Sequence, residues 1–255
     1  MTPDEAHALW RGAFGKELHK AVCSYCLPIF WAVRSSNKDW VIRNNGTAFI
    51  LNCGVGPFVV TAAHVFERYL EARGTEELGS WLGCIPFRME ERVLGYVGAT
   101  TLDVTTFTIN EDEVKETGKN VLYGNQVTWP PPRIMNGIGA LFAGFPGNQR
   151  IEDGSLECSF GLYSAFSPVS SVSDRHFGCA FDRSMWIDTM EKGLPEEGYN
   201  LGGINGCPVL AVDESQSGVL SWHLAGIGYS SSTNLGEIFF AHHADSIKPN
   251  GKLNH

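Results

Sequence analysis

The stretch that constrains this chain most strongly spans residues 202–209 and reads Gly202-Gly203-Ile204-Asn205-Gly206-Cys207-Pro208-Val209. Glycine adopts positive φ angles at little cost, so the glycines on either side of Asn205 allow a sharp turn that brings backbone N–H groups close to a carbonyl oxygen. The apolar residues that follow Pro208 are typical of a strand. We interpret the stretch as a tight turn around Asn205 that leads into a strand, and a plain glycine-rich hairpin is the alternative.

Two further motifs precede this turn. The first is Val59-Val60-Thr61-Ala62-Ala63-His64-Val65, in which small residues before His64 favour tight packing of the histidine segment. The second is Leu102-Asp103-Val104, where Asp103 opens an alternating, strand-like run 39 positions after His64. Asp39 precedes His64 and Asp112 lies in a polar segment, so both fit an acid partner for His64 less well than Asp103 does.

The order of histidine, aspartate and glycine-flanked turn resembles the trypsin/chymotrypsin-like serine proteases, whose turn reads Gly-x-Ser-Gly-Gly-Pro. The resemblance covers residues 28–247 and implies an all-β fold of two six-stranded antiparallel β-barrels. It also implies that His64 is the general base and that Asp103 orients it, while the N–H groups of Gly203 and Asn205 form the oxyanion hole. The serine of the family is replaced by Asn205.

This replacement decides which chemistry is expected. The amide nitrogen of Asn205 can donate a hydrogen bond toward His64, but its lone pair is delocalised into the carbonyl, so it is a very poor nucleophile. Cys207 is the other candidate nucleophile, but it lies two residues later and is expected to point into the second barrel. We therefore expect a serine-protease-like hydrolase scaffold that is inactive in this chain.

Three interpretations of such a scaffold stay open. The chain is a pseudoprotease that binds an extended peptide or a protein, or a member of a proteolytic family whose serine has been replaced. The third is a regulatory β-barrel module that binds a protein partner outside the cleft. The specificity pocket implied by the resemblance is formed by Tyr199, Gly226, Gly228, Tyr229 and Ser230. No acidic residue occupies the expected base of this pocket, so a preference for lysine or arginine is not indicated.

The rest of the chain divides around these motifs. Periodic apolar residues predict an N-terminal helix over residues 3–20, within an extension that spans residues 1–26. We expect the first barrel over 27–110, with a turn at Asn44-Asn45-Gly46, and an acidic, proline-containing linker over 111–134. The second barrel is predicted over 135–255, with a short C-terminal helix over 241–247.

Composition narrows the expected partners. The chain has 255 residues and a formal net charge of −9 without a cluster of basic residues, which argues against nucleic acid or anionic membranes as partners and favours a peptide or protein. Seven irregularly spaced cysteines, including Cys23 and Cys26, favour reduced, packed thiols over a zinc or redox site. We expect no metal and no cofactor. An acidic N-terminus without a signal peptide favours a cytoplasmic protein.

Overall fold

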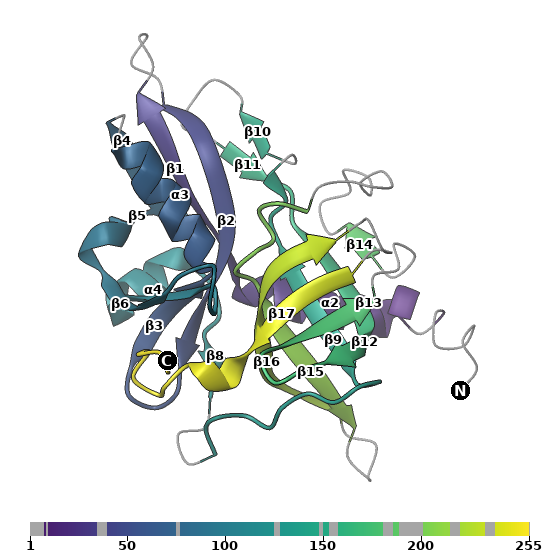
Figure 1. Cartoon of the computed structure of the whole chain (residues 1–255). Helices are drawn as coiled ribbons and strands as arrows, with labels where there is room; N and C mark the ends of the chain where they lie inside the picture. The colour runs from purple at the N-terminus through teal and green to yellow at the C-terminus, as the bar shows by residue number, and fades with distance from the viewer. Residues whose placement is uncertain are drawn as a thin grey trace.

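The computed structural model describes residues 8, 10–34, 40–74, 77–124, 128–147, 150–152, 158–180, 186–188, 201–214, 220–232 and 238–254. Within this part the chain is mostly strand, which confirms the predicted all-β class. The strands form two large sheets that lie side by side, with three α-helices packed around them (Figure 1).

The first sheet contains residues from the first half of the chain. Its order is β5-β4-β1-β2-β3-β7-β6, and β8 adds to β2 in parallel. The elements of this half are α2 (Ala13–Tyr25), β1 (Cys26–Arg34), β2 (Trp40–Asn52), β3 (Pro57–Thr61), α3 (Ala63–Arg73), β4 (Leu78–Leu82), β5 (Ile85–Pro86), η1 (Met89–Glu91), β6 (Val93–Val97), β7 (Val104–Thr108), α4 (Glu111–Thr117) and β8 (Leu122–Tyr123). The other pairings are antiparallel, and β5 and β6 form the two ends of a curled sheet that does not close in the described residues.

The second sheet is a closed, six-stranded antiparallel barrel. Its strands run in the order β9-β12-β13-β17-β16-β15 and return to β9. The elements of this half are β9 (Gly139–Gly144), β10 (Arg150–Glu152), β11 (Cys158–Phe160), β12 (Tyr163–Val172), β13 (His176–Ala180), β14 (Trp186–Asp188), β15 (Pro208–Glu214), β16 (Leu220–Ser232), β17 (Ile238–His243) and the 3₁₀ turn η4 (Ala244–Ser246). In the described residues the structure therefore contains one closed barrel and one curled sheet, where two closed barrels were expected.

Three groups of buried side chains hold these sheets together. One group lies in the first sheet, where Phe107 makes edge contacts with Phe66 of α3 and with Phe87. A second group fills the closed barrel, where Phe142 stacks on Phe239 at a centroid distance of 4.4 Å. The third group joins the two sheets and includes residues of α2. Since apolar burial is the main force that favours folding, this shared group fixes how the two sheets meet.

Several predicted boundaries differ from the structure. The helix α2 runs to Tyr25, so it includes Cys23, while Cys26 begins β1 and both cysteines are buried. Residues 241–247 form the end of β17 and a single 3₁₀ turn rather than an α-helix, so the predicted C-terminal helix is wrong. The segment 111–134, expected to be a linker, contains α4 and β8.

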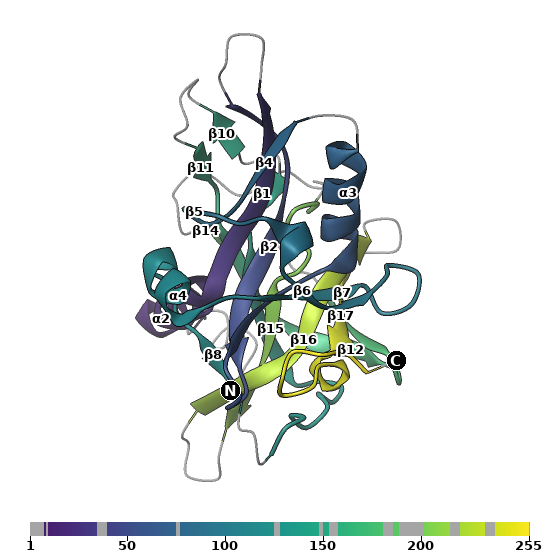
Figure 2. The same ribbon diagram turned by 90° about the vertical axis from the view of Figure 1, so that its left-hand side faces the viewer.

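The predicted turn at Asn44-Asn45-Gly46 is also wrong. These residues lie in the middle of β2, which runs without interruption for 13 residues (Figure 2). The register between β1 and β2 shifts next to them, between Trp31 and Ala32. This irregularity is typical of a β-bulge, which redirects side chains without ending the strand.

Candidate active site

His64 is held at the junction of a strand and a helix. The strand β3 ends at Thr61, and α3 begins one residue before His64. Gly46 of β2 makes room for this junction, because a Cβ atom there would lie 2.7 Å from Val65 Cγ1. The His64 side chain is 19% exposed, so the imidazole ring is fixed by its surroundings but still reaches solvent.

Asp103 binds His64 through both carboxylate oxygens. Oδ1 accepts the backbone N–H of His64 at 2.8 Å, and Oδ2 lies 2.7 Å from His64 Nδ1. The carboxylate is buried and can only accept, so His64 Nδ1 carries the hydrogen and Nε2 presents a lone pair. Asp103 has a φ of 53°, a left-handed conformation that aspartate tolerates better than most residues. Such strained backbone is often found at functional sites.

Asn205 completes a row of three side chains. Its Nδ2 lies 3.2 Å from His64 Nε2, so the amide donates to the lone pair opposite Asp103. The sequence-predicted residues His64, Asp103 and Asn205 are therefore brought together, from chain positions up to 141 residues apart. The contact occurs where the first sheet meets the turn that precedes β15.

The turn around Asn205 depends on its glycines. Gly203 and Gly206 have φ angles of 103° and 92°. A Cβ atom on Gly206 would lie 2.1 Å from Thr47 O, and one on Gly203 would lie 2.5 Å from Phe145 O. Both positions therefore require glycine for conformation and for space.

Two backbone N–H groups in this turn are without a hydrogen-bond partner among the described residues. In the described part of the chain, the N–H groups of Gly203 and Asn205 donate no hydrogen bond, and both residues are partly exposed. Buried or half-buried N–H groups are normally paired, so free ones beside His64 are notable. They lie where an oxyanion hole would be expected from the resemblance.

Thr47 and Asn45 brace the turn, and sequence reasoning missed both. Thr47 N–H donates to Asn205 O at 3.0 Å, and Thr47 Oγ1 donates to Gly203 O at 2.7 Å. The same hydroxyl accepts Phe145 N–H at 3.0 Å, and Asn45 Nδ2 donates to Phe145 O at 2.9 Å. These bonds connect β2 of the first sheet to the 203–206 turn. The only sequence signal was an unusual group of polar residues in an otherwise apolar region.

Cys207 is not placed to act as a nucleophile. It is fully buried among the apolar side chains of the closed barrel. Burial raises the pKa of the Cys207 thiol well above its ordinary value, so the thiolate is disfavoured. The expectation that this side chain points into the second barrel agrees with its position.

The residues expected to form the specificity pocket are only partly described. Tyr199 lies outside the described residues. Gly226 and Gly228 are buried, and Cβ atoms there would meet the interior of the barrel at Phe177 and Phe239. Ser230 is partly exposed at a register shift between β16 and β17.

Tyr229 has a partner that the sequence did not suggest. Its ring stacks on His242 of β17 at a centroid distance of 4.0 Å. Burial, and then the charge of Asp103, raise the pKa of Tyr229 above its ordinary value. Burial lowers the pKa of His242, and Asp103 partly offsets that effect.

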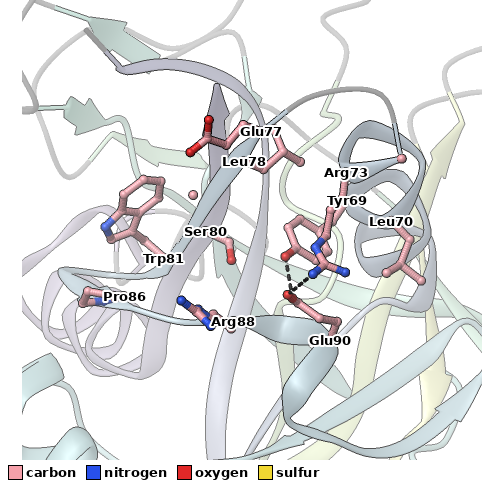
Figure 3. A pocket seen from close by; sticks show the side chains of 12 residues that line it. Tyr69, Leu70, Arg73, Glu77, Leu78, Ser80, Trp81, Pro86, Arg88 and Glu90 are labelled. Carbon is pink, nitrogen blue, oxygen red and sulfur yellow. Dashed lines mark hydrogen bonds and ion pairs between the residues drawn. The ribbon is translucent and has the colours of Figure 1, made fainter. Parts of the chain in front are cut away.

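A hollow of about 710 Å³ lies away from these residues, at the far end of α3 (Figure 3). Glu90 lies on one side of it, where it accepts from Tyr69 OH and pairs with Arg73 at 3.1 Å. Burial and this contact with Glu90 raise the pKa of Tyr69 to about 12. Both oxygens of the carboxylate are already occupied, and none of His64, Asp103 and Asn205 lines the hollow. We therefore do not assign catalysis to it.

Among the described residues, no group of three or more histidine, cysteine, aspartate or glutamate side chains could hold a metal ion. No helix in the described ranges is long and apolar enough to cross a membrane.

Comparisons with known proteins do not identify a family. No family model matches the sequence, and no curated protein matches it. One similar chain among solved structures comes from the work "Aromatic interactions drive the coupled folding and binding of the intrinsically disordered Sesbania mosaic virus VPg protein". The two chains are 12% identical, the match covers 86% of this chain and 92% of that chain, and the TM-score is 0.43. This degree of similarity supports no inference about function.

Proposed function

We propose that this chain is a trypsin-like serine endopeptidase scaffold in which Asn205 occupies the position of the nucleophile. The observation that carries the proposal is a row of two hydrogen bonds. His64 Nδ1 donates to Asp103 Oδ2 at 2.7 Å, and the Asn205 amide donates to His64 Nε2 at 3.2 Å. The free N–H groups of Gly203 and Asn205 support it independently.

The chemistry of such an arrangement follows from these contacts. A hydroxyl at position 205 would donate to the lone pair of His64 Nε2, which would accept its proton as the oxygen attacked a carbonyl carbon. The positive charge formed on His64 would be stabilised by Asp103, and the negative charge on the carbonyl oxygen by the backbone N–H groups of Gly203 and of residue 205. His64 would then return the proton to the leaving amine, and water would release the acyl group by the same route.

The chain as written lacks the hydroxyl at position 205. The Asn205 amide donates to His64 but offers no nucleophilic lone pair, so no acyl-enzyme can form. The N–H groups of Gly203 and Asn205 are unaffected by the replacement, and they can still donate hydrogen bonds to a carbonyl oxygen. The second part of the proposal is therefore that the chain binds an extended peptide beside His64, Asp103 and Asn205 without cleaving it.

The test is to restore the hydroxyl with Asn205→Ser. We expect this variant to cleave a broad peptide library and to react covalently with a fluorophosphonate probe, with one probe per chain by intact mass. Restoring a triad nucleophile is expected to raise kcat by roughly 10⁶-fold over the chain as written. The peptide bonds that are cut would define the specificity.

Asn205→Ala is the matched control, because it removes the amide without supplying a hydroxyl. It should remain inert toward the probe and should melt at a temperature similar to that of the serine variant. A folded Asn205→Ser protein that neither reacts with the probe nor cleaves any peptide would contradict the catalytic assignment.

A further inference from the structure

Four aromatic side chains line a second hollow, of about 350 Å³, between the two sheets. They are Tyr25 at the end of α2, Tyr123 of β8, Trp129 and Trp222 of β16. In Figure 1, β8 and β16 lie next to one another below the centre of the molecule. None of the catalytic-row residues lines this hollow. Its volume is at the lower end of the range for small-ligand sites, which suits a single side chain.

Several of these rings are exposed or fixed in place. Tyr123 is 78% exposed and Trp222 is 39% exposed. The Trp129 indole is held by a hydrogen bond from Nε1–H to Ile247 O at 2.5 Å. Gly124 leaves space for this ring, since a Cβ atom there would lie 2.5 Å from Trp129 Cε3. Exposed apolar surface gathered around a hollow is typical of a binding site.

The polar groups of the hollow favour a positively charged ligand with N–H donors. His223 lies in its wall, and His223 Nδ1 is 2.9 Å from Asp213 Oδ2 on the neighbouring strand. Asp213 is 46% exposed, so a carboxylate lies near the hollow. Because the carboxylate can only accept, His223 Nδ1 donates to Asp213, and the second oxygen of Asp213 can accept from a ligand.

Among the described residues, no lysine or arginine lines the hollow, and the chain as a whole carries a net charge of −9. The faces of tryptophan and tyrosine rings attract cations. A guanidinium group is planar, can stack on such rings and carries five N–H donors, whereas an ammonium group is a compact and strongly hydrated charge. Aromatic faces and a nearby, partly exposed carboxylate therefore match arginine better than lysine.

The surroundings also suggest how that arginine is presented. In the described part of the chain, β8 pairs only with β2, over two residues, so its other edge can accept the backbone of an added segment. Pro131 and Pro132 provide a stiff wall on the same hollow. We propose that this hollow binds an arginine side chain on an extended segment of a partner protein. The proposal is independent of the proposed function.

The test compares two short peptides that differ only in charge. Acetyl-Gly-Arg-Gly-amide and its citrulline analogue have nearly the same shape, but the citrulline side chain is uncharged. Titration of the full chain is followed by the NMR signals of the indole N–H groups. We expect the signals of Trp129 and Trp222 to shift with the arginine peptide, and the citrulline peptide to bind about tenfold more weakly because it loses the cation–π attraction.

Single substitutions test whether the arginine peptide binds at this hollow. Trp222→Leu and Asp213→Asn should each weaken binding of the arginine peptide severalfold. Trp81→Leu is the matched control, because Trp81 is a partly exposed tryptophan at the other hollow, and it should leave binding unchanged. Thermal melting shows that each variant is folded. Equal binding of the two peptides, absence of any indole shift, or full binding by folded Trp222→Leu would overturn the proposal.

Discussion

Two histidines of this chain each contact a side chain that could take part in acyl transfer, and their surroundings differ. His64 contacts Asp103 and Asn205, with free N–H groups nearby and access to solvent. His19 of α2 lies 2.7 Å, through Nδ1, from the hydroxyl of Ser164 in β12. The second pair thus contains the hydroxyl that the first lacks.

The second pair nevertheless has none of the other requirements. His19 and Ser164 are buried, and His19 Nε2 has no hydrogen-bond partner in the described residues, so no carboxylate orients the ring. Burial lowers the pKa of His19 to about 4, which keeps the ring neutral. A serine beside a histidine is therefore insufficient, and the acid, the N–H groups and the opening at His64 distinguish the candidate site from a packing contact.

The largest expected effect on the comparison between His64 and His19 is the loss of kcat when Asp103 is replaced. In the Asn205→Ser background, Asp103→Asn is expected to lower kcat by about 10⁴-fold. The bond from His64 N–H would hold the amide oxygen at the position of Oδ1, so the amide NH₂ would face His64 Nδ1 and impose the wrong tautomer. Asparagine also tolerates the positive φ of this position, so the fold should be kept. Peptide cleavage rates measure the effect, and an unchanged rate would remove Asp103 from the triad.

The second largest effect concerns the 203–206 turn, which lies beside His64 and has no counterpart beside His19. Gly206→Ala places a Cβ atom against Thr47 O and Thr61 Oγ1 at a φ of 92°. The conformational penalty and the overpacking together are expected to lower the free energy of unfolding by roughly 3–5 kcal/mol. Urea denaturation measures this loss. Gly137→Ala is the control, since it also has positive φ but has open space around it, and it should cost less.

The smallest effect is the pH dependence of stability that the buried His19–Ser164 pair should cause. The pKa of His19 is about 4 in the folded chain, below the ordinary value of 6.5, so the neutral form is favoured by folding. The contribution of neutral His19 to the free energy of unfolding is therefore fully present above pH 6.5. It is lost as the pH falls toward 4, and the total loss is about 3 kcal/mol. Urea denaturation at several pH values should show this slope, and the slope should be reduced in His19→Gln. Equal slopes in the two proteins would show that His19 is not the group responsible.

The sequence predicted the parts of the candidate site that depend on local residue types. Small residues before His64, a strand after Asp103 and glycines around Asn205 are patterns within a few positions, and the structure brings these three residues together. Thr47 and Asn45 could not be found this way. Their polar neighbours indicate a turn, but both lie inside β2. Thr47 bonds to Gly203, 156 residues away, and Asn45 bonds to Phe145, 100 residues away, so local patterns carry no sign of either contact. The open first sheet was also unpredictable, since closure depends on pairing between distant strand edges.

The bond between Thr47 N–H and Asn205 O has a mechanical consequence. Since β2 belongs to one half of the molecule and the 203–206 turn to the other, the two halves cannot separate without displacing residue 205 relative to His64. A compound that wedged between the halves would therefore disable a restored enzyme without entering its cleft. Such an inhibitor would lower kcat while competing with no substrate.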